Sequence, residues 1–233
     1  MKSVDAELKY AAVSTVLKIV LCLFGLGMIW LDVGAFHTDL LETSFTEIGQ
    51  ELLLFCCALI FLRCSAKAGQ KGFSLLAAGF FACLLMRELD GLFDPISHSA
   101  WCWPFMAILL WSLKQGLAAD RRADTLAALG RFVRTPSFGA MVSGGIVLVF
   151  SRVFGMGELW HQILQGGYAR LAKTMVEEGL ELLAYMIWFA ASIEHARGLR
   201  LGRNGLVLQG QGAVSFGAQH APRPQPEEQR KAG

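Results

Sequence analysis

The sequence predicts an all-α integral membrane protein, and three observations lead to this fold class. Of its 233 residues, 54% are hydrophobic and only 17% are charged. Several apolar runs reach about 20 residues, the helical length that crosses a hydrocarbon core of about 30 Å. These runs lack the alternation of a membrane β-barrel, and only helices or closed barrels satisfy their backbone hydrogen bonds in lipid. A bundle of membrane helices is therefore expected.

Six spanning helices are expected, and the charges between them orient the chain. We predict spans at about 16–36, 45–63, 72–93, 98–114, 137–156 and 175–195. Lys and Arg concentrate in the second and fourth connections and after the last span. By the positive-inside rule, this pattern predicts cytoplasmic termini in a membrane such as the bacterial inner membrane. Residues 198–233, rich in Gly, Gln, Arg and Pro, are expected to form a flexible cytoplasmic tail.

The chain also contains an internal repeat. Residues 24–53 and 154–183 match without a gap at ten of 30 positions, where chance gives roughly two or three. In the predicted topology the first two and the last two spans run in the same directions, so the repeat is parallel rather than inverted. We therefore expect one bundle, 1–197, with repeats at about 16–63 and 146–195 and linking helices within 72–114.

The repeat places pairs of glutamates in two apolar segments. Glu47 and Glu51 share a helix face one turn apart, and Glu177 and Glu181 do the same. A carboxylate inside a membrane is costly, so a duplicated pair points to function. If the two faces meet, four carboxylates must bind a cation, pair with an arginine or hold protons. We expect an outward-facing acidic cavity.

The third span and the outer loops supply further charged residues and histidines. The candidate metal ligands are Glu47, Glu51, Glu177, Glu181, Glu88 and His98. The candidate charge partners or ligand-binding residues are Arg87, Asp90, Asp94, Glu178, His161 and Arg152. Carboxylates and histidines together suit a divalent metal such as Zn, Fe or Mn, which is the cofactor expected for this set.

Three functions remain open. Intramembrane carboxylates with an arginine partner are typical of proton relays and favour a cation- or proton-binding protein coupled to small-molecule or ion transport. Facing carboxylates would also suit a metal-dependent hydrolase acting on lipid-like substrates at the outer leaflet. The third alternative is a non-catalytic lipid-binding or accessory subunit, in a homo-oligomer or a larger membrane complex. The lipid bilayer is the expected partner, and nucleic acid is not, because no basic stripe with aromatic residues is present.

Overall fold

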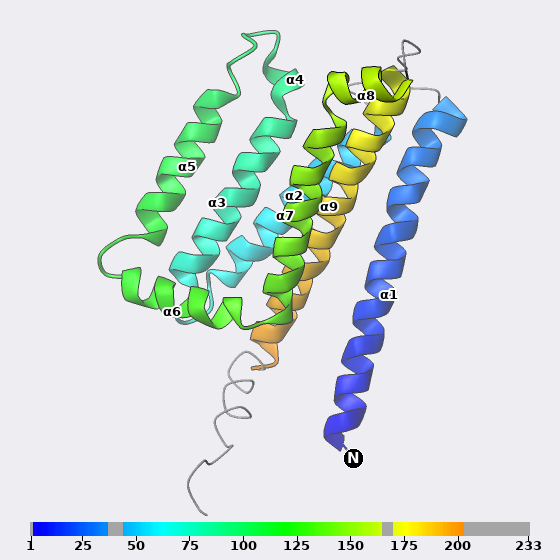
Figure 1. Ribbon diagram of the computed structural model, residues 1–233. Helices are drawn as coiled ribbons and strands as arrows, with labels where there is room; N and C mark the ends of the chain where they lie inside the picture. The colour runs from blue at the N-terminus through cyan, green and yellow to red at the C-terminus, as the bar shows by residue number, and fades with distance from the viewer. Residues whose placement is uncertain (1, 37–43, 165–169, 203–233) are drawn as a thin grey trace, which may run out of the picture.

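The computed structural model describes residues 2–36, 44–164 and 170–202, and the regular structure in these ranges is entirely helical (Figure 1). The elements in chain order are α1 (Lys2–Trp30), the π-helical η1 (Leu31–Phe36), α2 (Phe45–Cys64), α3 (Lys71–Glu88), α4 (Asp90–Phe93), α5 (Cys102–Gly116), α6 (Arg122–Val133), α7 (Pro136–Phe154), α8 (Gly157–Leu164) and α9 (Arg170–Arg200). The predicted all-α class is confirmed.

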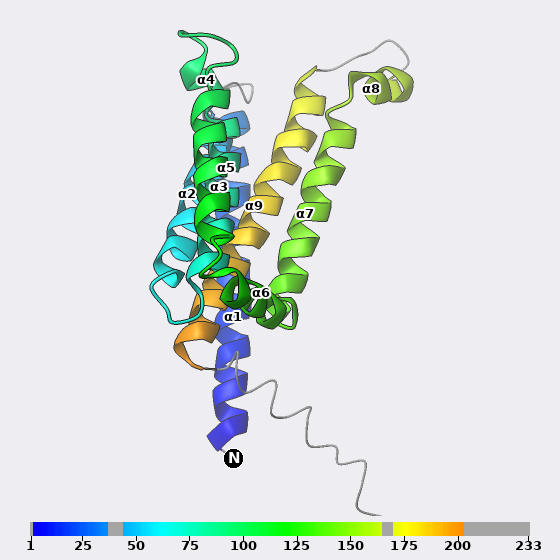
Figure 2. The same ribbon diagram turned by 90° about the vertical axis from the view of Figure 1, so that its left-hand side faces the viewer.

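The long helices lie side by side, and the chain reverses at either end of the bundle (Figures 1 and 2). α4 and α8 lie at one end, the α8 end, and α6 lies at the other, the α6 end. The central helix is α9, which packs against α7, α2 and α1. α3 joins α2 to α5, so α9 lies between α7 on one side and the α2–α3 pair on the other (Figure 2).

Buried aromatic and aliphatic side chains fill the centre of this bundle: Leu54, Cys57, Phe61, Phe81, Leu182, Tyr185 and Trp188. α7 approaches α9 closely because Gly144 lies against the ring of Trp188, where a Cβ atom would collide. The indole Nε1 of Trp188 donates a hydrogen bond to the Met141 carbonyl oxygen at 2.8 Å. An indole N–H needs such an acceptor when it is buried. This contact fixes α7 along α9.

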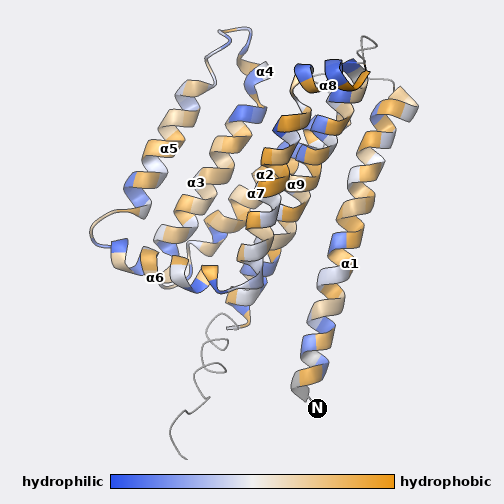
Figure 3. Cartoon of the chain, in the orientation of Figure 1, coloured by the Kyte–Doolittle hydropathy of each residue, from blue (hydrophilic) through white to orange (hydrophobic). Residues whose placement is uncertain are grey.

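Three helical segments are long and apolar enough to cross a membrane, by length and composition: Glu7–Phe36, Phe45–Cys64 and Pro136–Phe154. Figure 3 shows the apolar colouring along them. The other long helices depart from this pattern for identifiable reasons. α3 has Lys71, Arg87 and Glu88 within its 18 residues, α5 has only 15 residues, and α9 carries charges along its length. Membrane association is thus supported by three helices rather than by all six predicted spans.

Two short helices occupy regions that the sequence suggested were only connections. α6 lies across its end of the bundle (Figure 1), with Thr125, Ala128 and Phe132 buried. Its charged residues suggested a loop, but the apolar residues between them form one helical face. α8 similarly follows α7. The last helix continues to Arg200, and the predicted tail beyond residue 202 lies outside the described residues.

The start of α2 is held by a buried aspartate from η1. Asp32 accepts hydrogen bonds from the backbone N–H groups of Phe45 and Thr46, both at 2.7 Å, and from the Thr46 hydroxyl at 2.6 Å. Ser44 adds a conventional cap by accepting the Glu47 N–H at 3.1 Å. A negative charge at a helix N-terminus satisfies free N–H groups and the helix dipole. Asp32 therefore sets where α2 begins.

Candidate functional site

A cluster of polar side chains lies where α2, α3, α7 and α9 meet, toward the α8 end. In Figure 3 hydrophilic colouring appears in this part of the otherwise apolar bundle. We call it the interior cluster and define it by Gln50, Glu88, Ser151, Arg152, Lys173, Glu177, Glu178, Glu181 and Tyr185. It contains four carboxylates and two cationic groups.

Arg152 of α7 is the main cation of the cluster. One guanidinium nitrogen lies 2.8 Å from Glu181 Oε2, and the other lies 3.6 Å from Glu177 Oε1. Lys173 Nζ lies 3.4 Å from the second oxygen of Glu177. Glu181 is nearly inaccessible, at 3% side-chain exposure, whereas Arg152 is 51% exposed. Arg152 therefore contacts a buried carboxylate while part of its own side chain lies at the surface of the bundle.

Local sequence explains this geometry on both helices. Glu177 and Glu181 are one turn apart, so both face α7. Arg152 lies in the last turn of α7, where the helix dipole favours a cation. A Cβ atom on Gly155 would collide with the Glu177 carboxylate. The glycine thus leaves the space through which Glu177 reaches the arginine.

Two side chains link α9 to α2 and α3. The fully buried Gln50 donates from Nε2 to the Glu178 carbonyl oxygen and to its carboxylate, both at 3.0 Å. The remaining amide oxygen of Gln50, also buried, accepts no hydrogen bond. The Tyr185 hydroxyl donates to Glu88 Oε1 at 2.7 Å. Glu88 is thereby held against α9.

The charges of the interior cluster do not balance. Glu181 is repelled by Glu178, Glu88 and Glu177 and attracted by Arg152. Glu178 is likewise repelled by Glu88 and Glu177. Four ionised carboxylates would leave an excess of negative charge over Arg152 and Lys173, in a setting where water screens poorly. Protonation of a carboxylate or binding of a further cation would reduce this excess of negative charge.

The structure brings together five of the residues singled out from the sequence: Glu88, Glu177, Glu178, Glu181 and Arg152. It does not bring Glu51 to Glu181. Gln50 faces α9, and the next residue along a helix points about 100° away. Glu51 consequently lies beside Leu85 and Leu89 of α3, with Glu88 as its charged neighbour. The expected meeting of the two repeated glutamate faces does not occur.

The remaining candidates lie at the edges of the α8 end. Arg87 pairs with Asp90 at 2.6 Å and stacks over the Trp101 ring. His98 lies 3.2 Å from Asp94, and the histidine side chain is 91% exposed.

Glu47 is in the first turn of α2. His161 and Glu158 are exposed on α8, three residues apart. Glu-x-x-His is a spacing used by di-metal helical bundles.

Within residues 2–36, 44–164 and 170–202, no three His, Cys, Asp or Glu side chains converge in a way that could hold a metal ion. The acidic residues of the interior cluster are instead engaged with Arg152, Lys173, Gln50 and Tyr185. Of the six predicted metal ligands, Glu88, Glu177 and Glu181 lie in the cluster and Glu51 is beside it. Glu47 is in the first turn of α2, and His98 is at the surface.

Sequence reasoning missed four members of the cluster: Gln50, Ser151, Lys173 and Tyr185. Tyr185 carried a usable signal, because its counterpart 130 positions earlier is Phe55. The second copy therefore gains a hydroxyl at an otherwise matched aromatic position. Gln50 also interrupts an apolar run next to Glu51.

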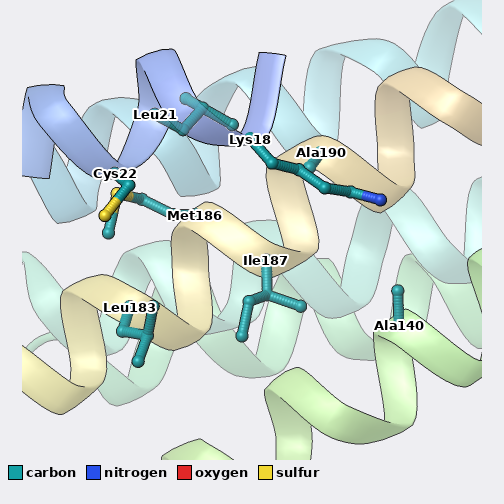
Figure 4. A pocket seen from close by; sticks show the side chains of 8 residues that line it. All are labelled: Lys18, Leu21, Cys22, Ala140, Leu183, Met186, Ile187 and Ala190. Carbon is teal, nitrogen blue, oxygen red and sulfur yellow. The ribbon is translucent and has the colours of Figure 1, made fainter. Parts of the chain in front are cut away.

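A separate pocket lies between α1, α7 and α9 and is almost entirely apolar (Figure 4). Its volume is about 210 Å³, and its lining includes Leu21, Leu183, Met186 and Ile187. Lys18 at this pocket binds Glu194 at 2.9 Å. The pocket shares no lining residue with the interior cluster.

No protein-family model matches the chain, and no curated protein or solved structure shows significant similarity to it.

Proposed function

We propose that the protein spans a membrane with six helices and binds protons or a cation in the interior cluster, as part of ion or small-molecule transport. Support for the six spans comes from the alternating directions of α1, α2, α3, α5, α7 and α9 (Figure 1). The parallel repeat is supported by matched motifs, since each copy has a long helix, a short helical element and a second long helix.

One observation carries the proposal: two cations serve four carboxylates inside a helical bundle. An uncompensated carboxylate in such a place binds a proton or recruits a cation, because the isolated charge is costly. The buried Gln50 oxygen without a donor adds an acceptor beside Glu178. Both features favour a positively charged guest.

The cluster lies close enough to the α8 end for protons or cations to exchange with the solution on that side. Gln50 lies five residues into α2, about 8 Å along the helix, and Arg152 lies two residues, about 3 Å, before the end of α7. The half-exposed Arg152 and the partly exposed Lys173 form its outer edge. With Lys and Arg gathered at the α6 end, the positive-inside rule makes the α8 end the outer face.

The first test is uptake of protons and of Mn²⁺ by the purified protein in detergent. We expect a Glu178→Gln/Glu181→Gln variant to lose at least tenfold in Mn²⁺ affinity, or to abolish a proton uptake that the wild-type protein shows on acidification. Electron paramagnetic resonance reports free Mn²⁺, and potentiometric titration reports the protons. Asp94→Asn, at the exposed surface of the same end, is the matched control and should change neither.

Proteoliposomes then separate binding from transport. A trapped pH dye should report proton movement under an imposed membrane potential, and the Glu178→Gln/Glu181→Gln variant should slow it. The proposal fails if this variant alters neither Mn²⁺ affinity nor proton uptake. Mn²⁺ binding combined with hydrolysis of a lipid ester would instead support the hydrolase hypothesis.

A further inference from the structure

A groove on the outer side of α2 and α3 combines an apolar lining with one carboxylate. Its lining residues are Ile48, Glu51, Leu52, Phe55, Leu85 and Leu89, and its volume is about 320 Å³. Ile48, Leu52 and Phe55 are 54%, 52% and 47% exposed, so the groove opens away from the bundle. In a membrane-spanning α2 that side faces lipid.

Glu51 is the only charged residue of this lining. In the described part of the chain it takes part in no hydrogen bond or ion pair, and its charged neighbour is a second carboxylate, Glu88. An ionised carboxylate is expensive in a membrane unless it takes up a proton or a positive charge accompanies it.

Comparison of the two repeat copies shows that Glu51 lacks the arginine partner of its counterpart. Its counterpart Glu181 is paired with Arg152, but the residue 130 positions before Arg152 is Cys22. The first copy therefore has no arginine at the position that matches Arg152. Glu51 instead presents its carboxylate at the groove between apolar side chains, and Glu88 behind it adds a second negative charge nearby.

We propose that this groove binds an amphiphilic amine that enters from the lipid. The ammonium group donates hydrogen bonds to Glu51, and Glu88 adds attraction, because a carboxylate acts only as an acceptor and an ammonium only as a donor. The hydrocarbon chain lies along Leu52, Phe55 and Leu85. From Glu51 to Phe55 the groove runs four residues along α2, about 6 Å, enough for the first few methylene groups of an alkyl chain.

The negative charge of the groove disfavours the binding of other amphiphiles. A fatty acid or an anionic lipid would meet two carboxylates, and a neutral alcohol would leave the charge of Glu51 uncompensated. This inference goes beyond the proposed cation binding in the interior cluster. The groove has its own carboxylate and its own opening, so either site can fail without the other.

The test measures retention of radiolabelled dodecylammonium by the protein in phosphatidylcholine nanodiscs, with empty discs subtracted. We expect saturable binding of one amine per chain and no saturable binding of radiolabelled dodecanol. Glu51→Gln should weaken amine binding at least tenfold. Glu158→Gln, an exposed glutamate on α8, is the matched control and should leave it unchanged.

Two results would overturn the proposal: no saturable amine binding above empty discs, or equal affinities of the wild-type protein and Glu51→Gln. Equal binding of dodecanol would show an apolar groove without a cation site, and it too would refute the inference. The Glu178→Gln/Glu181→Gln variant keeps the two proposals apart. It should retain saturable amine binding even if the interior cluster proves to bind neither protons nor Mn²⁺.

Discussion

Replacing Arg152 with glutamine tests whether the interior cluster depends on its half-exposed cation. The substitution removes the group that lies 2.8 Å from Glu181 and leaves a carboxylate of 3% exposure without its ion pair. Lys173 cannot replace it, because it contacts Glu177 from one turn away. We therefore expect Arg152→Gln to destabilise the folded protein.

The magnitude follows from the burial of the two partners. Removing one member of a fully buried ion pair costs about 3–5 kcal/mol, and an exposed pair contributes about 0–1 kcal/mol. With Glu181 buried and Arg152 51% exposed, an intermediate loss of about 1–3 kcal/mol is expected. For a domain of this size that corresponds to a decrease in Tm of about 3–9 °C.

Thermal unfolding in a mild detergent measures this loss, and a double-mutant cycle assigns it to the pair. Glu181→Gln removes the buried charge, so the Arg152→Gln/Glu181→Gln variant should be more stable than Arg152→Gln alone. Arg87→Gln is the control, since Arg87 forms an exposed pair with Asp90. A Tm for Arg152→Gln equal to that of the wild-type protein, or strictly additive effects in the cycle, would refute the reasoning.

Three further substitutions test stability: two should lower it and one should raise it. Asp32→Ala removes three hydrogen bonds at the start of α2 and should cost about 1–2 kcal/mol in the free energy of unfolding, with no loss in Asp94→Asn. Tyr185→Phe leaves Glu88 without its 2.7 Å donor and should cost about 1–3 kcal/mol by the same measurement. His195→Phe should instead raise the Tm, because both ring nitrogens are buried without hydrogen bonds among three phenylalanine rings. A lower Tm would show that this histidine has a polar partner in solution.

The helices were predictable because their signal is local. Apolar runs of sufficient length marked α2 and α7 to within one or two residues of their observed ends. The predictions failed where charge and periodicity disagreed. The arginines of 121–134 suggested a loop, although Thr125, Ala128 and Phe132 bury one face of α6. Composition identified the fold class, and the arrangement of short helices depended on tertiary packing.

The candidate site was predictable only in part, because a charged residue in an apolar run identifies itself but not its partner. Glu181 could be recognised as a repeated charge inside an apolar run, and Arg152 as a charge near the end of one. Their pairing depends on the rotation of α7 against α9, which Gly144 and Gly155 permit. One residue of helical rotation separates Gln50, which faces α9, from Glu51, which faces α3. Sequence alone could not fix that rotation.

Glu88 connects the two sites and gives a last prediction about their coupling. It accepts the Tyr185 hydroxyl on the cluster side, is attracted by Arg152, and repels Glu51 on the groove side. Removing a positive charge from the cluster makes the potential at the groove more negative. Arg152→Gln should therefore tighten dodecylammonium binding, and Glu178→Gln should weaken it.

Binding in nanodiscs at low ionic strength measures both changes, and salt should reduce them. A cation bound in the cluster should weaken amine binding in the groove by charge repulsion. Because coupling between two binding sites is reciprocal, an amine in the groove should weaken cation binding in the cluster by that same factor. Unchanged amine affinity in a folded Arg152→Gln variant would show that Glu88 does not transmit charge between the sites. The opposite order of the two variants would show that the groove does not select its occupant by charge.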